Sequence, residues 1–197
     1  MPIMPAPPLE LIKKVLEDFE LRMREILEGA WEDWQTMTKR ALLSPRSRAS
    51  IVFDFIKARA LLEFDGDRNI RAIPKGQTVH FLFRDRVLVR FKKANSSGLG
   101  SNIETQAVIE FVDPQFPLFA LPPIYNIEVC YRLDKLATRM ALLAVTARQR
   151  NTKLWAYELN RPTSAAVLPM PEPPPGDSTP PEVRPRKPLD KPEHGGE

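Results

Sequence analysis

The chain has little cysteine, histidine or glycine, and it lacks a long hydrophobic run. Its 197 residues include one cysteine, two histidines and eight glycines, and no run of about 18 apolar residues occurs. The single cysteine, Cys130, excludes an intramolecular disulfide framework and is typical of a reducing compartment. The start of the chain lacks the basic and apolar segments of a signal peptide. We therefore expect a cytoplasmic protein without a membrane span.

The same scarcity removes most catalytic arrangements. His80 is isolated in an apolar run, and His194 lies near the C-terminal end. Together with Cys130 they cannot supply the four ligands of a tetrahedral zinc site. The sequence contains neither H-E-x-x-H nor G-x-S-x-G, and Cys130 has no obvious base. The residues thus predict no metal site and no cofactor, and they do not specify a reaction.

Proline, by contrast, is abundant and unevenly distributed. Eleven of the 21 prolines lie in residues 162–197, which contain no aromatic residue. Such a segment cannot bury enough apolar surface to offset its ordering entropy, so we predict a disordered tail at 162–197 and a disordered lead at 1–8. The tail has four basic and six acidic residues, so residues 1–161 carry a net charge of about +6, against +4 for the whole chain. This moderate excess permits attraction to an anionic partner.

A long amphipathic helix is predicted over residues 9–43. Its apolar positions step by three and four residues, with charged residues between them. The stripe either packs on the chain's own sheet or pairs with a second copy or a partner helix. The residues expected to mediate pairing are Leu16, Phe19, Met23 and Ile26. Gly29 is expected to mark a bend in this helix.

Residues 44–161 predict an α+β domain. Ser44 and Pro45 form a cap and first turn, which start a second helix that extends to about Glu63. An inserted helix is expected at 103–112, where a strand is the alternative. Strands are expected at 70–73, 79–93 (a hairpin), 126–133, 140–148 and 153–159. Neighbouring hairpins favour an antiparallel sheet of five to six strands after the two N-terminal helices.

The hairpin at 79–93 is the most prominent candidate for a binding surface. Residues 68–93 contain eight Lys or Arg and a single acid, Asp85. Alternation along the strands is expected to turn the aromatic residues toward the core and the charges outward. The residues expected to bind an anion or a partner are Arg84, Arg86, Arg90, Lys92 and Lys93. They would bind either an acidic protein surface or a nucleic-acid backbone, and the lack of outward aromatics favours the protein.

A divergent nuclease is the enzymatic alternative. The order of helices and strands is loosely compatible with a restriction-endonuclease-like core, which uses clustered carboxylates and a lysine. The residues that would form such a site are Glu63, Asp65, Asp85 and Lys92. Arg90 stands two residues before Lys92, where this type of site requires an acid. The nuclease is therefore the less favoured interpretation.

Three short motifs resemble those of a family of uncharacterised bacterial proteins. They are VLVRFKK at 87–93, SNIETQA at 101–107 and YRLDKL at 131–136, and the resemblance covers roughly residues 44–159. Members of this family are associated with loci for ImmA/IrrE-type metallopeptidases and helix-turn-helix regulators. The resemblance implies one component of a regulatory or toxin–antitoxin-type pair, with a metallopeptidase or regulator as partner, and no catalytic residues. We expect a non-enzymatic protein-binding module, with nucleic-acid binding as the other alternative.

Overall fold

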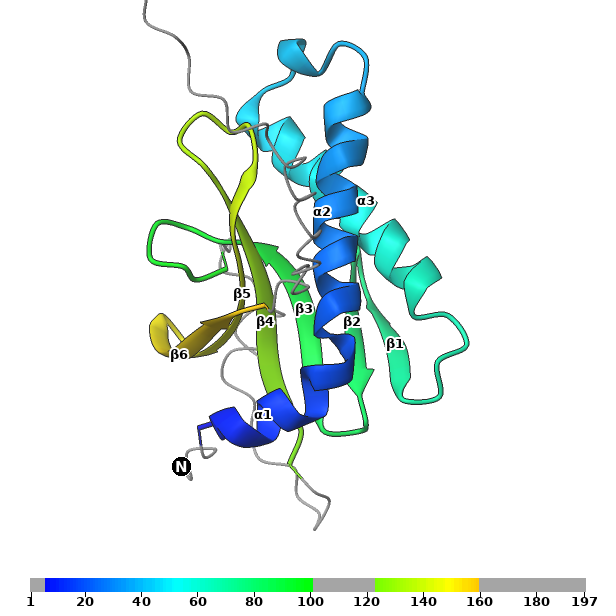
Figure 1. The fold of residues 1–197 in the computed structure, drawn as a ribbon, viewed down its shortest axis with the longest axis vertical. Coiled ribbons are helices and arrows are strands. Elements are labelled where there is room, and N and C mark those ends of the chain that lie inside the picture. Colours follow the sequence, from blue (N-terminus) through cyan, green and yellow to red (C-terminus); the bar gives the residue numbers. More distant parts are fainter. Residues whose placement is uncertain (1–5, 101–122, 160–197) are drawn as a thin grey trace, which may run out of the picture. The chain divides into compact units, whose positions relative to one another are not determined.

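Residues 6–100 and 123–159 are described by the computed structural model (Figure 1). They belong to one unit of the chain, which spans Met1–Pro162. The helix expected at 103–112 and the tail expected at 162–197 lie outside the described residues. The described elements are, in order, α1 (Leu9–Leu16), η1 (Glu17–Phe19), α2 (Glu20–Thr36), η2 (Arg40–Leu42), α3 (Pro45–Glu63), β1 (Ile70–Lys75), β2 (Thr78–Phe83), β3 (Val87–Lys93), β4 (Tyr125–Leu133), β5 (Met140–Gln149) and β6 (Thr152–Glu158).

The N-terminal helical segment is shorter than the sequence predicts. It is interrupted by the single 3-10 turn η1 and ends at Thr36, not at residue 43. Met37 is extended, with ψ 128°, and Lys39 has a positive φ of 63°, so the helix cannot continue. Gly29 is not a bend: it lies buried in α2 where the Arg59 side chain of α3 crosses, and a Cβ atom there would collide with that guanidinium.

The second helix forms as its capping residues predict. The Ser44 hydroxyl accepts a hydrogen bond from the backbone N–H of Ser47 at 3.1 Å, and Pro45 occupies the first turn. The Arg59 guanidinium of α3 donates to both carboxylate oxygens of Asp33 in α2, at 2.6 and 2.8 Å. This two-bond contact fixes the two helices side by side, and Gly29 leaves the space for it.

The sheet confirms the α+β class. Its six strands lie in sequence order, and neighbouring strands are antiparallel except β3 and β4, which are parallel. The expectation of an entirely antiparallel sheet is therefore wrong at this one pair. The chain between Lys93 and Tyr125 is long enough to return to the end of the sheet at which β3 began.

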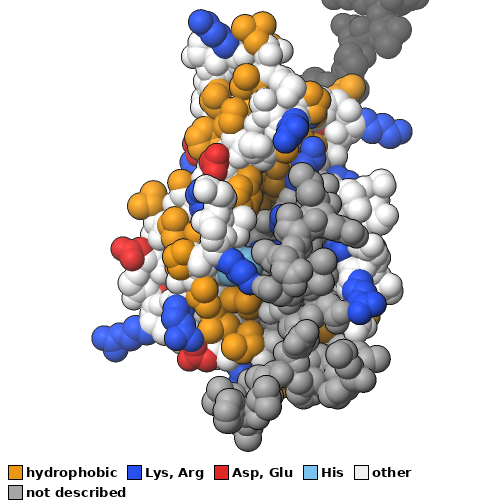
Figure 2. Space-filling view, turned by 180° about the vertical axis from the view of Figure 1, so that it is seen from behind, with side chains coloured by type: hydrophobic (Ala, Val, Ile, Leu, Met, Phe, Trp, Pro, Cys, Tyr) orange, Lys and Arg blue, Asp and Glu red, His pale blue; other side chains and the backbone are white. Residues whose placement is uncertain are grey.

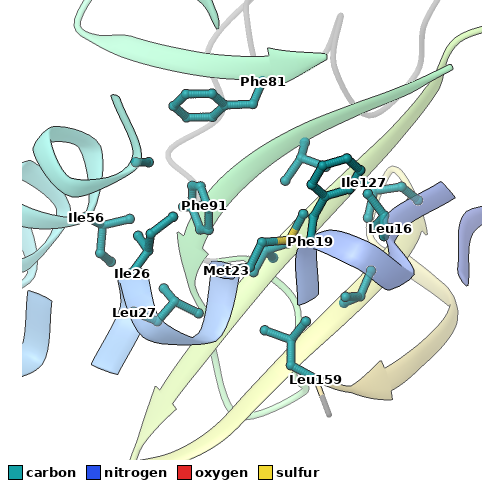
Figure 3. Close-up of a cluster of buried hydrophobic side chains, with 14 of the residues drawn as sticks. Leu16, Phe19, Met23, Ile26, Leu27, Ile56, Phe81, Phe91, Ile127 and Leu159 are labelled. Carbon is teal, nitrogen blue, oxygen red and sulfur yellow. The ribbon is translucent and has the colours of Figure 1, made fainter. Parts of the chain in front are cut away.

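One face of the sheet, covered by the helices, holds the main hydrophobic core (Figures 1 and 3). Phe81 and Phe83 of β2 point to this face, and the rings of Phe19 and Phe83 lie 5.1 Å apart. The four residues expected to mediate pairing are all in this core, at 0–3% exposure: Leu16, Phe19, Met23 and Ile26. The expectation that they bind a second copy or a partner is corrected, because the chain's own sheet covers them.

Candidate functional site

The predicted basic hairpin forms, but its cations are used unequally. Its turn contains Arg84 and Asp85, both with positive φ (47° and 51°), and the Arg86 N–H donates to the carbonyl of Phe83 at 2.9 Å. The Arg84 guanidinium is hydrogen-bonded to the Asp18 carboxylate. Arg86 is exposed at the turn, so it stays available to a partner.

Arg90 does not lie on an open surface. It points to the sheet face opposite the helices, is only 4% exposed, and donates through Nε and Nη2 to Glu128 Oε1 at 3.1 and 2.5 Å. The parallel register of β3 and β4 places Glu128 directly opposite Arg90. The expectation that Arg90 binds an anion is therefore corrected, because Glu128 already compensates its charge.

Glu128 is the centre of a buried ionic cluster, which sequence reasoning missed. Its Oε2 accepts the Gly100 N–H at 3.0 Å, and its Oε1 lies 3.7 Å from Nη1 of Arg148. A Cβ atom at position 100 would collide with this carboxylate, so a glycine is needed for the approach. An acid inside the apolar run of β4 was the available signal, since a buried charge requires partners.

Burial is the main cause of shifted pKa values in the titratable groups around this cluster. Burial, and then the charges of Arg90, Lys75 and Lys92, lower the pKa of His80 to about 4. Burial and the Arg90 charge also lower the pKa of Lys92. Burial, and then the Glu128 charge, raise the pKa of Cys130 to about 12, so its thiol remains protonated and weakly nucleophilic.

The described side chains on the side of the molecule opposite the helices include more basic than acidic ones. Figure 2 views the molecule from this side and shows Lys and Arg side chains among hydrophobic ones, with few acidic side chains. Lys92 and Lys93 are both partly buried at the end of β3. Of the five cations predicted to bind a partner, two are thus ion-paired and two are half-buried, which weakens the case for a phosphate-binding surface.

The residues of the predicted nuclease site do not converge. Glu63 accepts from Nε of Arg22 at 2.8 Å, Asp85 pairs with Arg71, and Asp65 is exposed in the turn after α3. Asp85 precedes β3 and Lys92 lies near its end, and seven residues of strand span roughly 20 Å. Within the described ranges, no three His, Cys, Asp or Glu side chains are grouped to hold a metal ion. The structure thus does not assemble the site that these four residues were expected to form.

The two edges of the sheet differ in their protection against a further strand. At β1, the Arg84 N–H donates to the carbonyl of Asn69, so in the observed register the nitrogen of Pro74 points away from β2. Proline offers no donor at this outward position. The strand also carries Arg71 and Lys75, and charged residues discourage edge pairing. The β1 edge is therefore blocked.

The β6 edge is open by comparison. The Leu159 N–H donates to the carbonyl of Leu143, so in this register the backbone groups of Ala156 and Glu158 point away from β5. The strand contains no proline, and Ala156 is exposed. No strand in the part of the chain that the structure describes pairs with its outer side. β6 thus presents backbone donors and acceptors to an incoming strand.

An aromatic pair borders this open edge, and sequence reasoning missed it as well. Trp155 and Tyr157 stack with centroids 6.1 Å apart and an interplanar angle of 25°. The indole N–H of Trp155 donates to the carbonyl of Pro7 at 2.7 Å, so β6 is hydrogen-bonded to the segment just before α1. Alternating aromatics in the last predicted strand were the available signal. The sequence pattern predicts a strand at 153–159 and by itself assigns no role to these aromatics.

No helix in residues 6–100 and 123–159 has the length and apolar character needed to cross a membrane. Comparisons of the chain with protein-family models, with curated proteins and with solved structures found no match.

Proposed function

We propose that this chain is a protein-binding module that takes an extended segment of its partner as an additional strand along β6. The observation that carries the proposal is the asymmetry of the sheet: Pro74 blocks one edge, whereas Ala156 and Glu158 leave the other open. Main-chain hydrogen bonds supply affinity in this mode, and alternate side chains supply specificity.

The chain's own ion pairs favour a protein over nucleic acid as the partner. Arg84 is bonded to Asp18 and Arg90 to Glu128, so few free cations remain on the hairpin to neutralise phosphates. The resemblance of the sequence motifs supplies the further proposal that the partner belongs to a regulatory or toxin–antitoxin-type pair. The lone, buried thiol of Cys130 suits the cytoplasm as the location.

The test uses nine-residue peptides selected from a displayed random library on the immobilised full-length chain. The decisive variant is Ala156→Pro, which removes an outward N–H and leaves the β5–β6 ladder bonds intact. The matched control is Ala72→Pro in β1, since Ala72 shares the outward backbone position of Pro74. Circular dichroism and thermal melting of both variants establish that they fold.

We expect selected peptides to bind the wild type and Ala72→Pro alike, and to lose at least tenfold in affinity for Ala156→Pro. One lost hydrogen bond and the steric block of a strand register account for this factor. Hydrogen exchange should also slow at the amides of Ala156 and Glu158 when a peptide is bound. Equal binding to Ala156→Pro would refute strand addition at β6.

A further inference from the structure

A polar cleft lies between the N-terminal helices and β6. Its volume is about 370 Å³, and its lining residues are Glu10, Lys13, Lys14, Glu17, Glu20 and Tyr157. Three carboxylates and two ammonium groups give it a net negative charge. The ring of Tyr157 is the aromatic surface in this set, so the cleft combines an aromatic face with acids.

A cation already occupies this aromatic face. The ammonium of Lys13 lies 5.6 Å from the ring centroid of Tyr157, within the range of a cation–π contact. Among the described residues, Lys13 is also paired with Glu10 at 3.8 Å, and the two side chains are 44% and 85% exposed. Exposed pairs of this kind contribute little, so another cation can replace Lys13 at small cost.

A buried acid lies next to the same ring. Glu20 is 4% exposed and lines the cleft. Burial, followed by the charge of Glu20 near the phenol, raises the pKa of Tyr157, so the hydroxyl stays protonated. The Glu20 carboxylate already has a partner in the chain, and its two oxygens can accept further hydrogen bonds. The cleft therefore offers a cation both a π face and a desolvated carboxylate, where an ionic hydrogen bond is strong.

The position of Tyr157 connects this cleft to the open edge. Its side chain points to the helix-covered face, opposite Val145 of β5. In an added strand, the residue directly across from Tyr157 would project to the same face, with Cβ atoms about 5 Å apart. One side chain of the partner would thus be directed into the cleft.

We propose that the cleft receives an arginine side chain of the partner strand, with its guanidinium over the Tyr157 ring in place of the Lys13 ammonium. This inference rests on the proposed strand addition at β6. Arginine fits better than lysine, because a planar guanidinium stacks on a ring while its N–H fork donates to a carboxylate such as Glu20.

The probe is N-acetyl-arginine amide, titrated into the full-length chain while the side-chain NMR signals of Trp155 and Tyr157 are followed. N-acetyl-citrulline amide, which has nearly the same shape without the charge, is the ligand control. We expect saturable shifts with the arginine compound and none with the citrulline compound. Glu20→Gln should weaken binding roughly tenfold, as expected for a hydrogen bond to a charged group.

Two lysine variants separate the ring contact from general charge. Lys13→Ala and Lys14→Ala each remove one positive charge from the cleft, but only Lys13 lies over the ring. The affinity of Lys13→Ala for the arginine compound should be about twofold to fivefold higher than that of Lys14→Ala, because the competing cation over the ring is gone. Equal effects of the two variants, weaker binding to Lys13→Ala, or equal binding of the citrulline compound would overturn the inference.

The variant Ala156→Pro distinguishes this inference from the proposed function. The arginine compound contacts side chains only, so its affinity for this variant should equal that for the wild type. If the wild type does not bind the arginine compound while its peptide binding is still weakened by Ala156→Pro, only the proposed arginine site in the cleft is refuted. Retained arginine binding with peptides insensitive to Ala156→Pro would refute the strand addition alone.

Discussion

Lowering the pH from 8 to 5 should destabilise the fold through His80. The imidazole is 6% exposed and faces Arg90, Lys75 and Lys92, so protonation would add a fourth charge to a buried cationic neighbourhood. Its pKa is about 4 in the folded chain and about 6.5 when unfolded. The unfolded chain therefore binds more protons between these values, and the stability present above pH 6.5 is lost as the pH falls toward 4.

The magnitude follows from the two pKa values. At pH 5 the unfolded histidine is almost fully protonated and the folded one is mostly neutral, which lowers the free energy of unfolding by roughly 2 kcal/mol relative to pH 8. That is a large part of the 5–15 kcal/mol typical of a domain. Urea denaturation at pH 8, 7, 6 and 5, monitored by tryptophan fluorescence and circular dichroism, measures it directly.

The variant His80→Leu isolates this contribution. Carboxylates whose pKa values are lowered by partners, such as Asp33 beside Arg59, titrate in wild type and variant alike. The variant should therefore lose about 2 kcal/mol less between pH 8 and pH 5 than the wild type. An identical pH dependence of the two proteins, or an NMR titration of the His80 ring with a midpoint near 6.5, would refute the reasoning.

Three further perturbations test other contacts. Arg90→Ala should lower the free energy of unfolding by about 3–5 kcal/mol, because it leaves Glu128 buried without its main partner. The control Arg86→Ala, at the exposed turn, should change this free energy by less than about 0.5 kcal/mol. Urea titrations of the two variants test the difference. Asp85→Gly should raise the melting temperature, since glycine adopts the positive φ of 51° without steric cost, and an unchanged or lower value would contradict this. Phe19→Glu should destabilise the fold by about 4 kcal/mol or more without changing the molar mass in light scattering. If an oligomer instead dissociates and the stability is retained, the apolar stripe of the N-terminal helices belongs to an interface.

Local signals located most elements correctly because the residues that specify them are close in sequence. Alternation identified the strands, and Ser44 with Pro45 predicted the start of α3 from the cap chemistry alone. The end of the first helical segment was misplaced at 43. Its apolar spacing continues past Thr36, but Met37 and Lys39 take non-helical backbone angles that spacing does not reveal.

The candidate site was harder to predict because it depends on which strands become neighbours. Period-two alternation correctly separated Arg90 from the aromatic face of β3. It could not show that Arg90 is buried, since its partner Glu128 lies 38 residues later in the chain. Likewise, nothing local to Tyr157 indicates that Lys13 lies over its ring, 144 residues away in sequence.

By itself, then, the sequence determined the α+β class, the extent of most strands and the scarcity of cysteine and histidine. These properties follow from composition and from side-chain periodicity, which act over a few residues. Only the tertiary structure decided that the amphipathic stripe belongs to the core, that Arg90 is neutralised by Glu128, and that β6 rather than β1 is the open edge among the described strands. Each of these depends on pairing between distant segments, and an apolar or charged residue does not specify which distant segment will cover it.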